Sequence, residues 1–159
     1  MDPVVYIETT IPSYYFDSRP SLEFEIDRTR EWWNEERYNY ELVTSEVVLA
    51  ELDHPRNPYR EGCLSLIDGL PALQVTDEVS EIAEVYIART IMPRSKVLDS
   101  LHLAIASYYR VDFLLTWNCR HLANANKYHA IRQVNAELGL FVPILTTPYD
   151  LRAILEEDF

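Results

Sequence analysis

Short apolar runs rich in β-branched residues alternate with amphipathic segments of helical length along this chain, and this alternation limits its folds most strongly. The clearest runs are residues 4–7 and 113–117, which are apolar almost throughout, as expected of strands buried on both faces. Strands that alternate with helices form a mainly parallel sheet with helices on both faces. The sequence therefore predicts a three-layer α/β/α fold with a mainly parallel central sheet of about four or five strands.

The same reading predicts the position of each element. Helix starts are indicated by the capping residues Ser21, Thr44 or Ser45, and Thr76, and by the Asn57-Pro58 pair, while Gly139 indicates a helix end. The expected strands cover residues 4–7, 42–43, 73–75, 113–117 and 142–145. The expected helices cover residues 21–33, 45–52, 58–70, 77–87, 96–110 and 121–138, followed by a short helix that begins near residue 147.

Length and composition predict a single domain over residues 1–159. The chain is 48% hydrophobic and 12% aromatic, which supplies a core and argues against disorder. No repeat or linker divides it. Two cysteines cannot build a disulfide framework, and the sequence shows neither a signal peptide nor a transmembrane run. We expect a cytoplasmic protein without a membrane partner.

The net charge limits the classes of function that the chain can have. The formal charge of −12 weighs against a broad surface that follows nucleic-acid phosphates with Lys and Arg. It leaves room for a local site in which carboxylates hold a divalent cation and the cation meets a phosphate. The three scattered glycines exclude a Gly-rich phosphate loop, and the four histidines lack zinc-site spacing.

Five oxygen-bearing side chains are candidates for such a site. Glu8 and Asn118 directly follow the two clearest strands, Glu46 and Glu51 lie on the helix after the second strand, and Asp99 begins a very apolar helix. Ligands in open parallel sheets bind beyond the carboxyl ends of the strands. Carboxylates gathered there repel one another unless a cation is bound, and all-oxygen ligation suits Mg²⁺ or Mn²⁺. Such an ion supports phosphodiester hydrolysis.

Each candidate also has a purely structural interpretation. Glu8 alone could be a solvated loop residue, and Glu46 could simply complement a helix dipole. Asp99 precedes a dry apolar stretch and needs a partner, which could be His102 or an arginine.

Three segments together resemble the PIN-domain ribonuclease family, and most of all its VapC-like toxins from type II toxin–antitoxin pairs. The segments are Val-Tyr-Ile-Glu-Thr at 5–9, Ser-Glu-Val-Val-Leu-Ala-Glu-Leu from 45, and Asp-Ser-Leu-His-Leu-Ala from 99 leading into Leu-Leu-Thr-Trp-Asn-Cys-Arg-His from 114. The resemblance implies a Mg²⁺- or Mn²⁺-dependent endoribonuclease, often a homodimer, restrained by a small antitoxin protein.

The resemblance maps the acidic positions of the family onto Glu8, Glu51, Asp99 and Asn118, with Glu46 as an additional metal candidate. Two positions depart from the family pattern. The first is usually Asp, and Glu8 reaches one methylene further. The fourth is often Asp, and the neutral Asn118 should weaken cation binding.

Further residues are assigned supporting roles. Thr9 and Thr116 are expected to hydrogen-bond the carboxylates. Arg94, Lys96 and Arg120 flank the Asp99 and Asn118 segments and are expected to bind RNA phosphates. Two alternatives stay open: a catalytically inactive PIN-like module that binds RNA or protein, and a small-molecule phosphohydrolase that uses the same acidic cluster.

Overall fold

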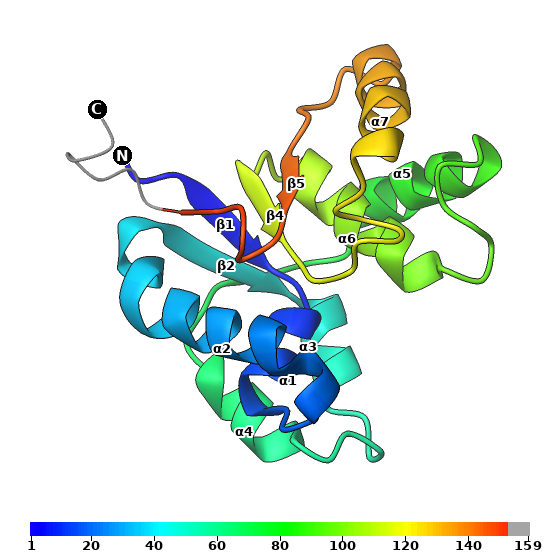
Figure 1. Ribbon diagram of the computed structural model, residues 1–159. Coiled ribbons are helices and arrows are strands. Elements are labelled where there is room, and N and C mark those ends of the chain that lie inside the picture. Colours follow the sequence, from blue (N-terminus) through cyan, green and yellow to red (C-terminus); the bar gives the residue numbers. More distant parts are fainter. Residues whose placement is uncertain (153–159) are drawn as a thin grey trace.

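A five-stranded sheet forms the centre of the computed structural model, which describes residues 1–152 (Figure 1). The strand order is β3-β2-β1-β4-β5, and every neighbouring pair is parallel. The strands are β1 (Val4–Ile7), β2 (Glu41–Ser45), β3 (Ala72–Leu73), β4 (Phe113–Leu115) and β5 (Ile144–Thr146). The predicted parallel α/β sheet is confirmed, and all five expected strands are present.

Strand order places the carboxyl ends of β1 and β4 next to each other. β1 lies at the centre of the sheet, fully buried from Val5 to Ile7, and pairs with β2 on one side and β4 on the other. The chain leaves β1 toward β2 and later returns to the opposite side, so the order reverses between β1 and β4. Ligands bind at such switch points in open α/β sheets.

Seven α-helices within residues 1–152 flank the sheet (Figure 1). They are α1 (Thr10–Phe16), α2 (Glu23–Glu31), α3 (Glu46–Leu52), α4 (Arg60–Leu66), α5 (Asp77–Ala88), α6 (Val97–Tyr108) and α7 (Ala125–Glu137). Helix α1 packs against α2 and α4, whereas α5 packs against α6. None of the helices in this part of the chain is long and apolar enough to cross a lipid bilayer.

Local sequence signals explain where several helices begin and end. Ser45 caps α3 by accepting a hydrogen bond from the Val48 amide, and Thr76 caps α5 through Val79 in the same way. Gly139 follows α7 with φ of +69°, as a helix-ending glycine should. Thr90 follows α5 with φ of +60°, a conformation that is costly for a β-branched residue.

Three predicted helices differ from the structure. The expected helix over 21–33 is divided into a 3₁₀ turn (Pro20–Leu22), α2 and a π-helical turn (Trp32–Glu36). The expected helix over 121–138 begins only at residue 125, because Asn118 and Asn124 organise a turn before it. The helix expected near 58 begins at residue 60, after a turn in which the Asn57 side chain accepts from the Tyr59 amide.

The N-terminal and C-terminal ends differ from prediction as well. Helix α1 was not predicted; its Pro12 lies in the first turn of this seven-residue helix, where proline is tolerated. The short helix expected from 147 is a turn over residues 148–150 followed by irregular structure at 151–152, and the rest of that expectation lies outside the described residues.

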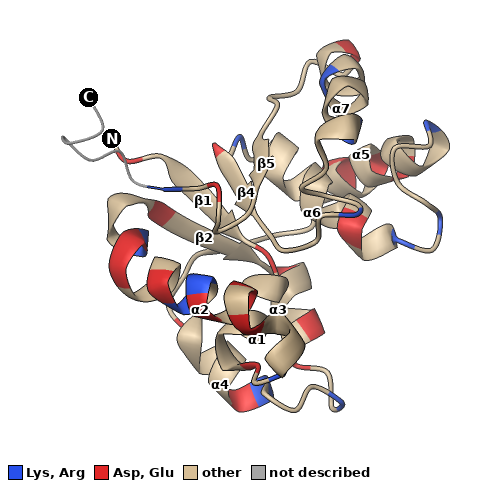
Figure 2. Ribbon diagram, viewed as in Figure 1, with Lys and Arg blue, Asp and Glu red and all other residues tan. Residues whose placement is uncertain are grey.

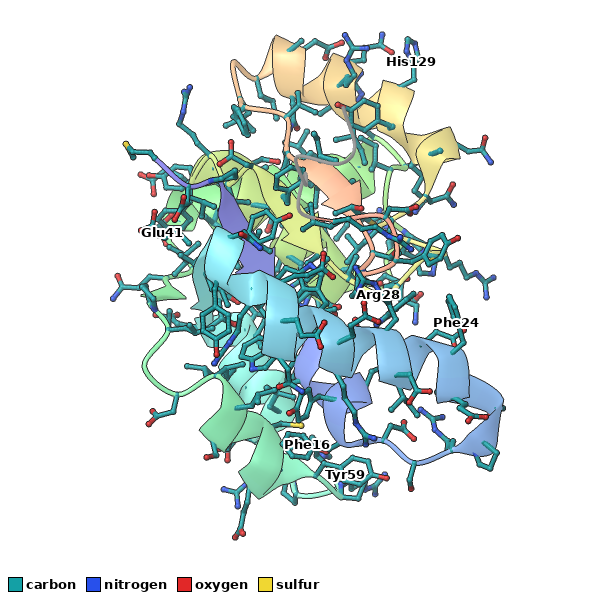
Figure 3. The ribbon with its side chains drawn as sticks, turned by 60° about the vertical axis from the view of Figure 1, so that its left-hand side comes forward. Phe16, Phe24, Arg28, Glu41, Tyr59 and His129 are labelled. Atoms are coloured by element: carbon teal, nitrogen blue, oxygen red, sulfur yellow. The ribbon has the colours of Figure 1, made fainter. Side chains whose placement is uncertain are left out.

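Arg28 ties α2 to the segment that follows β5. Its side chain is only 8% exposed and forms ion pairs with Glu31 and Glu36. The guanidinium also donates to the carbonyl oxygens of Pro148 and Leu151, at 2.6 and 3.5 Å. Figure 3 shows Arg28 between the helix and this segment.

Candidate functional site

Glu8 follows β1 and is buried, with 3% of its surface exposed, so it is not a solvated loop residue. Its Oε1 atom accepts three hydrogen bonds: from the Thr10 amide at 3.1 Å, the Thr10 hydroxyl at 2.5 Å and the Thr116 hydroxyl at 2.6 Å. Its Oε2 atom accepts none from the described residues. Burial raises the pKa of Glu8, although the charge of His102 and the threonine hydrogen bonds oppose the shift.

The turns after β1 and β4 hold Glu8 because the two strands are parallel neighbours. Ile7 pairs with Leu115, so the residues that follow them, Glu8 and Thr116, lie side by side. The Thr10 hydroxyl oxygen also accepts a hydrogen bond from the Trp117 amide at 2.8 Å. One carboxylate oxygen is thereby fixed, and the other has no hydrogen-bond donor within residues 1–152.

Glu51, on α3, is held by a chain of hydrogen bonds that reaches into the core. Its Oε1 atom lies 2.6 Å from Nε2 of His102 and accepts from the Thr9 hydroxyl at 3.1 Å. Nδ1 of His102 lies 2.6 Å from the Tyr6 hydroxyl, which lies 2.7 Å from Oγ of Ser45. The side chain of Glu51 is 26% exposed, whereas that of His102 is 1% exposed. Glu51 therefore lies at the solvent end of a buried relay.

Donor chemistry sets the direction of this relay. An ionised carboxylate only accepts, so Nε2–H of His102 donates to Glu51. In the neutral imidazole, Nδ1 then accepts from the Tyr6 hydroxyl, whereas in the protonated imidazolium Nδ1–H donates to the Tyr6 oxygen. Burial lowers the pKa of His102, but the Glu51 hydrogen bond and the charges of Glu8, Glu51 and Asp99 outweigh it and leave the pKa raised. Burial is the main cause that raises the pKa of Tyr6 well above its usual value, so its hydroxyl stays protonated.

Asp99 lies in the first turn of α6 and is half-buried. No hydrogen bond or ion pair to its carboxylate is formed within residues 1–152. Its expected partner, His102, instead binds Glu51, so that interpretation was wrong. The charges of Glu8, Glu51 and Asp99 all help to raise the pKa of His102, so the three carboxylates lie within electrostatic range of one imidazole.

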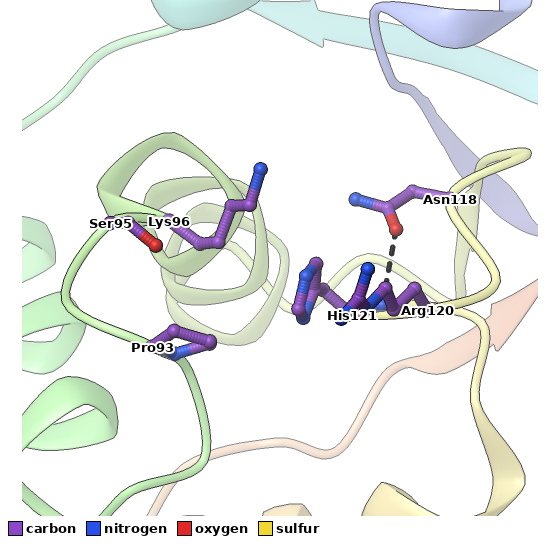
Figure 4. Close-up of a pocket in the computed structure, with 6 residues that line it drawn as sticks. All are labelled: Pro93, Ser95, Lys96, Asn118, Arg120 and His121. Atoms are coloured by element: carbon purple, nitrogen blue, oxygen red, sulfur yellow. Dashed lines mark hydrogen bonds between the residues drawn. The ribbon is translucent and has the colours of Figure 1, made fainter.

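Asn118 follows β4 and lines a hollow of about 510 Å³ (Figure 4). Its Oδ1 atom accepts from the His121 amide at 3.0 Å, and its own amide donates to the Thr116 hydroxyl at 2.9 Å. Lys96 and Arg120 line the same hollow, whereas Arg94 lines an adjoining one. Two of the three predicted phosphate-binding residues thus border Asn118.

Glu46 is exposed and lies apart from the relay. Its carboxylate accepts a long hydrogen bond, 3.4 Å, from the Val75 amide. It shares an apolar hollow with Glu51, His54 and Leu98. The structure thus links Glu51, but not Glu46, to the buried hydrogen bonds.

The carboxylate and amide oxygens of the site are the ligands that a hard divalent cation prefers. They do not surround an ion completely with protein ligands. Glu8 and Glu51 each keep one oxygen without a protein donor in the described part of the chain. Within that part, however, no three His, Cys, Asp or Glu side chains are grouped as a metal site. Mg²⁺ is usually bound through one or two carboxylates, with water and substrate oxygens completing its shell. The residues fit an ion held in this open way.

Several residues of the site were not predicted as such. Thr10, Tyr6 and Ser45 hold the carboxylates but belong to segments interpreted only as turn, strand and cap. His121 lines the hollow beside Asn118, and Lys127, on α7, lines the adjoining hollow together with His121. Thr10 is two residues from Glu8, a spacing at which a hydroxyl reaches a carboxylate, so this signal was available.

The sequence matches no protein-family profile and no curated protein. Among solved structures, VapC20 from Mycobacterium tuberculosis, described as a toxin that cleaves the sarcin-ricin loop, superposes with a TM-score of 0.54 at 13% identity. That match covers 74% of this chain and 92% of VapC20. VapBC2 from Rickettsia felis, solved with a DNA fragment from its promoter, matches at a TM-score of 0.48 and 13% identity, over 91% of this chain and 98% of that one. The chain thus has the PIN-like α/β fold of VapC20.

Proposed function

We propose that this protein is a metal-dependent endoribonuclease, as the motif resemblance implies. The observation that carries the proposal is the state of Glu8: a buried carboxylate at the switch point of the sheet, with one oxygen held by two threonines and no Lys or Arg ion pair in the described residues. An ionised carboxylate in such surroundings is costly, and within the described residues the charge of His102 is the only positive charge that offsets that cost. A bound dication would supply a further positive partner.

Glu8, Glu51 and Asp99 would hold the Mg²⁺ or Mn²⁺ ion, and Asn118 would contribute its amide oxygen or orient water. When bound, the ion would supply an activated water and charge neutralisation at the phosphate. The threonines keep Glu8 fixed, and His102 keeps Glu51 fixed. Rigid carboxylates lose little conformational entropy when they bind an ion.

Lys96 and Arg120 would bind the phosphate that is hydrolysed. Both line the hollow beside Asn118, and neither forms an ion pair with a carboxylate of residues 1–152. Figure 2 shows basic residues on the loop between α5 and α6 and before α7, while acidic residues occupy much of the α1–α4 side. Local basic charge lets an acidic protein meet RNA at one place.

Cleavage of single-stranded RNA with and without Mn²⁺ tests the proposal. We expect cleavage that EDTA abolishes and that Asp99→Asn lowers at least about 100-fold with no loss of folding. The matched control is Asp27→Asn, the same carboxylate-to-amide change at an exposed position of α2. Activity of Asp99→Asn equal to that of the control would remove Asp99 from the mechanism. Cleavage of a simple phosphate monoester but not RNA would favour a phosphohydrolase.

A catalytically inactive PIN-like module is the second candidate. It is favoured by the neutral Asn118 and by the absence of a three-ligand group among residues 1–152. Such a module would show no Mn²⁺-dependent thermal shift, whereas an ion at 100 times its Kd stabilises the folded state by about 2.7 kcal/mol.

The toxin role, a small antitoxin, a homodimer and a cytoplasmic location are also proposals, supported only by the motif resemblance and the shared fold. Growth arrest on expression, relieved by co-expression of a small protein from an adjacent reading frame, would test the toxin role. Light scattering would test the dimer.

A further inference from the structure

Both lysines of the chain lie in one small region. Lys96 lines the hollow beside Asn118, and Lys127 lines a second hollow of about 490 Å³ together with Arg94. The two hollows adjoin, because Pro93, Arg120 and His121 line both. A chain with 14 basic and 26 acidic residues thus gathers four cations and a histidine here.

None of these four cations forms an ion pair with an acidic residue in the described part of the chain, although the charge of Asp99 acts on Lys127. Arg89, nearby on the sequence, is paired with Glu137 at 2.7 Å, and Arg19, Arg28 and Arg60 are paired as well. By contrast, the hydrogen bonds of the Lys127 ammonium within residues 1–152 go only to neutral groups: Nδ1 and the carbonyl of His121, each at 3.4 Å, and Sδ of Met92 at 3.8 Å.

The contact with Lys127 also determines which ring nitrogen of His121 carries a proton. An ammonium can only donate, so Nδ1 of His121 accepts and its proton lies on Nε2. This Nε2–H has no acceptor within residues 1–152. Burial, followed by the charge of Lys127, lowers the pKa of His121, which favours this neutral form. Burial also lowers the pKa of Lys127, with Asp99 opposing.

Lys127 lies in the first turn of α7, where no acidic residue balances the positive end of the helix dipole. A cation there is unfavourable unless an anion binds. Three kinds of donor therefore point to the same ligand: cations without an ion pair and an imidazole N–H without an acceptor, both judged over residues 1–152, and the start of a helix. Phosphate oxygens accept from all three.

We propose that Arg94, His121 and Lys127 form a second phosphate-binding subsite, which holds the RNA phosphate next to the one bound at Lys96 and Asn118. This inference rests on the proposed RNA substrate. It adds that productive binding requires two successive phosphodiesters of the RNA, one in each hollow. The two adjoining hollows share lining residues and present two sets of donors. A polynucleotide can place linked phosphates in both hollows, whereas a free phosphate can occupy only one, so a polynucleotide is the favoured ligand.

Binding measured in EDTA tests the subsite without cleavage. Oligoribonucleotides without terminal phosphates compete against a labelled RNA; one has a single phosphodiester and the other has two. We expect the second phosphodiester to improve wild-type affinity about 10-fold. Lys127→Gln should lose most of this gain and reduce the salt dependence of RNA binding by about 0.7 in slope. Lys127→Arg should restore both. Arg56→Gln, on the loop between α3 and α4, is the control and should behave as wild type.

An equal gain from the second phosphodiester in wild type and Lys127→Gln would overturn the subsite. So would competition by inorganic phosphate as strong as that of the longer oligonucleotide. Reductive methylation with ¹³C formaldehyde gives a readout in the native chain, since it labels two lysines and the N-terminus. The Lys127 signal should shift with the longer oligonucleotide, and its failure to move at saturation would also overturn the proposal. RNA binding of this kind without Mn²⁺-dependent cleavage would refute the proposed function and leave the subsite standing.

Discussion

Replacing Tyr6 by Phe removes one buried hydroxyl at the centre of the relay that holds Glu51. The residue is fully buried, and its hydroxyl lies 2.6 Å from Nδ1 of His102 and 2.7 Å from Oγ of Ser45. Phenylalanine keeps the ring and its edge contact with His102, so apolar packing is unchanged. Ser45 retains the Val48 amide, but Nδ1 of His102 loses its only partner in the described residues.

A buried polar atom left without a partner costs about 1–3 kcal/mol. For a chain of this length 1 kcal/mol shifts Tm by about 3 °C, so Tyr6→Phe should lower Tm by about 3–9 °C. The same change should weaken Mn²⁺ binding about 10-fold, because His102 would no longer be fixed against Glu51.

Thermal unfolding without metal, followed by Mn²⁺ titration, measures both effects. Tyr15→Phe is the matched control, since its hydroxyl makes one exposed hydrogen bond to Asn34 and should cost no more than about 0.5 kcal/mol. If the two variants melted at the same temperature, the relay would not stabilise the fold. If Tyr6→Phe melted lower but bound Mn²⁺ as wild type does, the relay would not position Glu51.

Three further predictions concern the scaffold. Arg28→Gln should lower the free energy of unfolding in urea by about 3 kcal/mol, because it breaks the largely buried ion pair with Glu36 and the bond to Pro148; a loss below about 1 kcal/mol would contradict this. Asp17→Asn should lower Tm at pH 7, because hydrogen bonds from Arg19 lower the pKa of Asp17 to about 2. That stabilisation is complete above the unfolded pKa and is lost as pH falls through about 2, so a Tm difference that persisted below pH 2 would disprove the assignment. Thr90→Gly should raise Tm by about 3 °C by relieving the positive φ, and a lower Tm would show that the turn is not strained.

The sheet could be predicted because each strand is indicated by the few consecutive residues that form it. Apolar runs such as residues 113–117 are short and continuous, and the alternation of strand and helix leaves few topologies. The closeness of Glu8 and Thr116 follows from the parallel pairing of β1 with β4 alone, because the residues that follow two paired parallel strands lie side by side at the same edge of the sheet. Cap residues Ser45 and Thr76 likewise act within three residues of their position.

The rest of the site depends on how helices pack, which periodicity does not encode. The pairing of His102 with Glu51 rather than Asp99 arises because α3 and α6 meet beside β1. Lys127 reaches His121 only because a turn, not a helix, covers residues 118–124. Sequence reasoning therefore found the carboxylates and two threonines that hydrogen-bond them, Thr9 and Thr116. It did not find Thr10 or the His102–Tyr6 pair.

Direct measurement of Mn²⁺ binding by calorimetry tests the central claim that Glu8 and Asp99 hold a dication. We predict saturable binding to the wild-type chain, weakened at least about 10-fold by Glu8→Gln and by Asp99→Asn but unchanged in Asp27→Asn. Glu8→Gln should fold, because an amide oxygen can keep the three hydrogen bonds on Oε1 and its NH₂ replaces an oxygen that accepts none from residues 1–152. Absence of saturable binding, or equal affinity in all four proteins, would contradict the account.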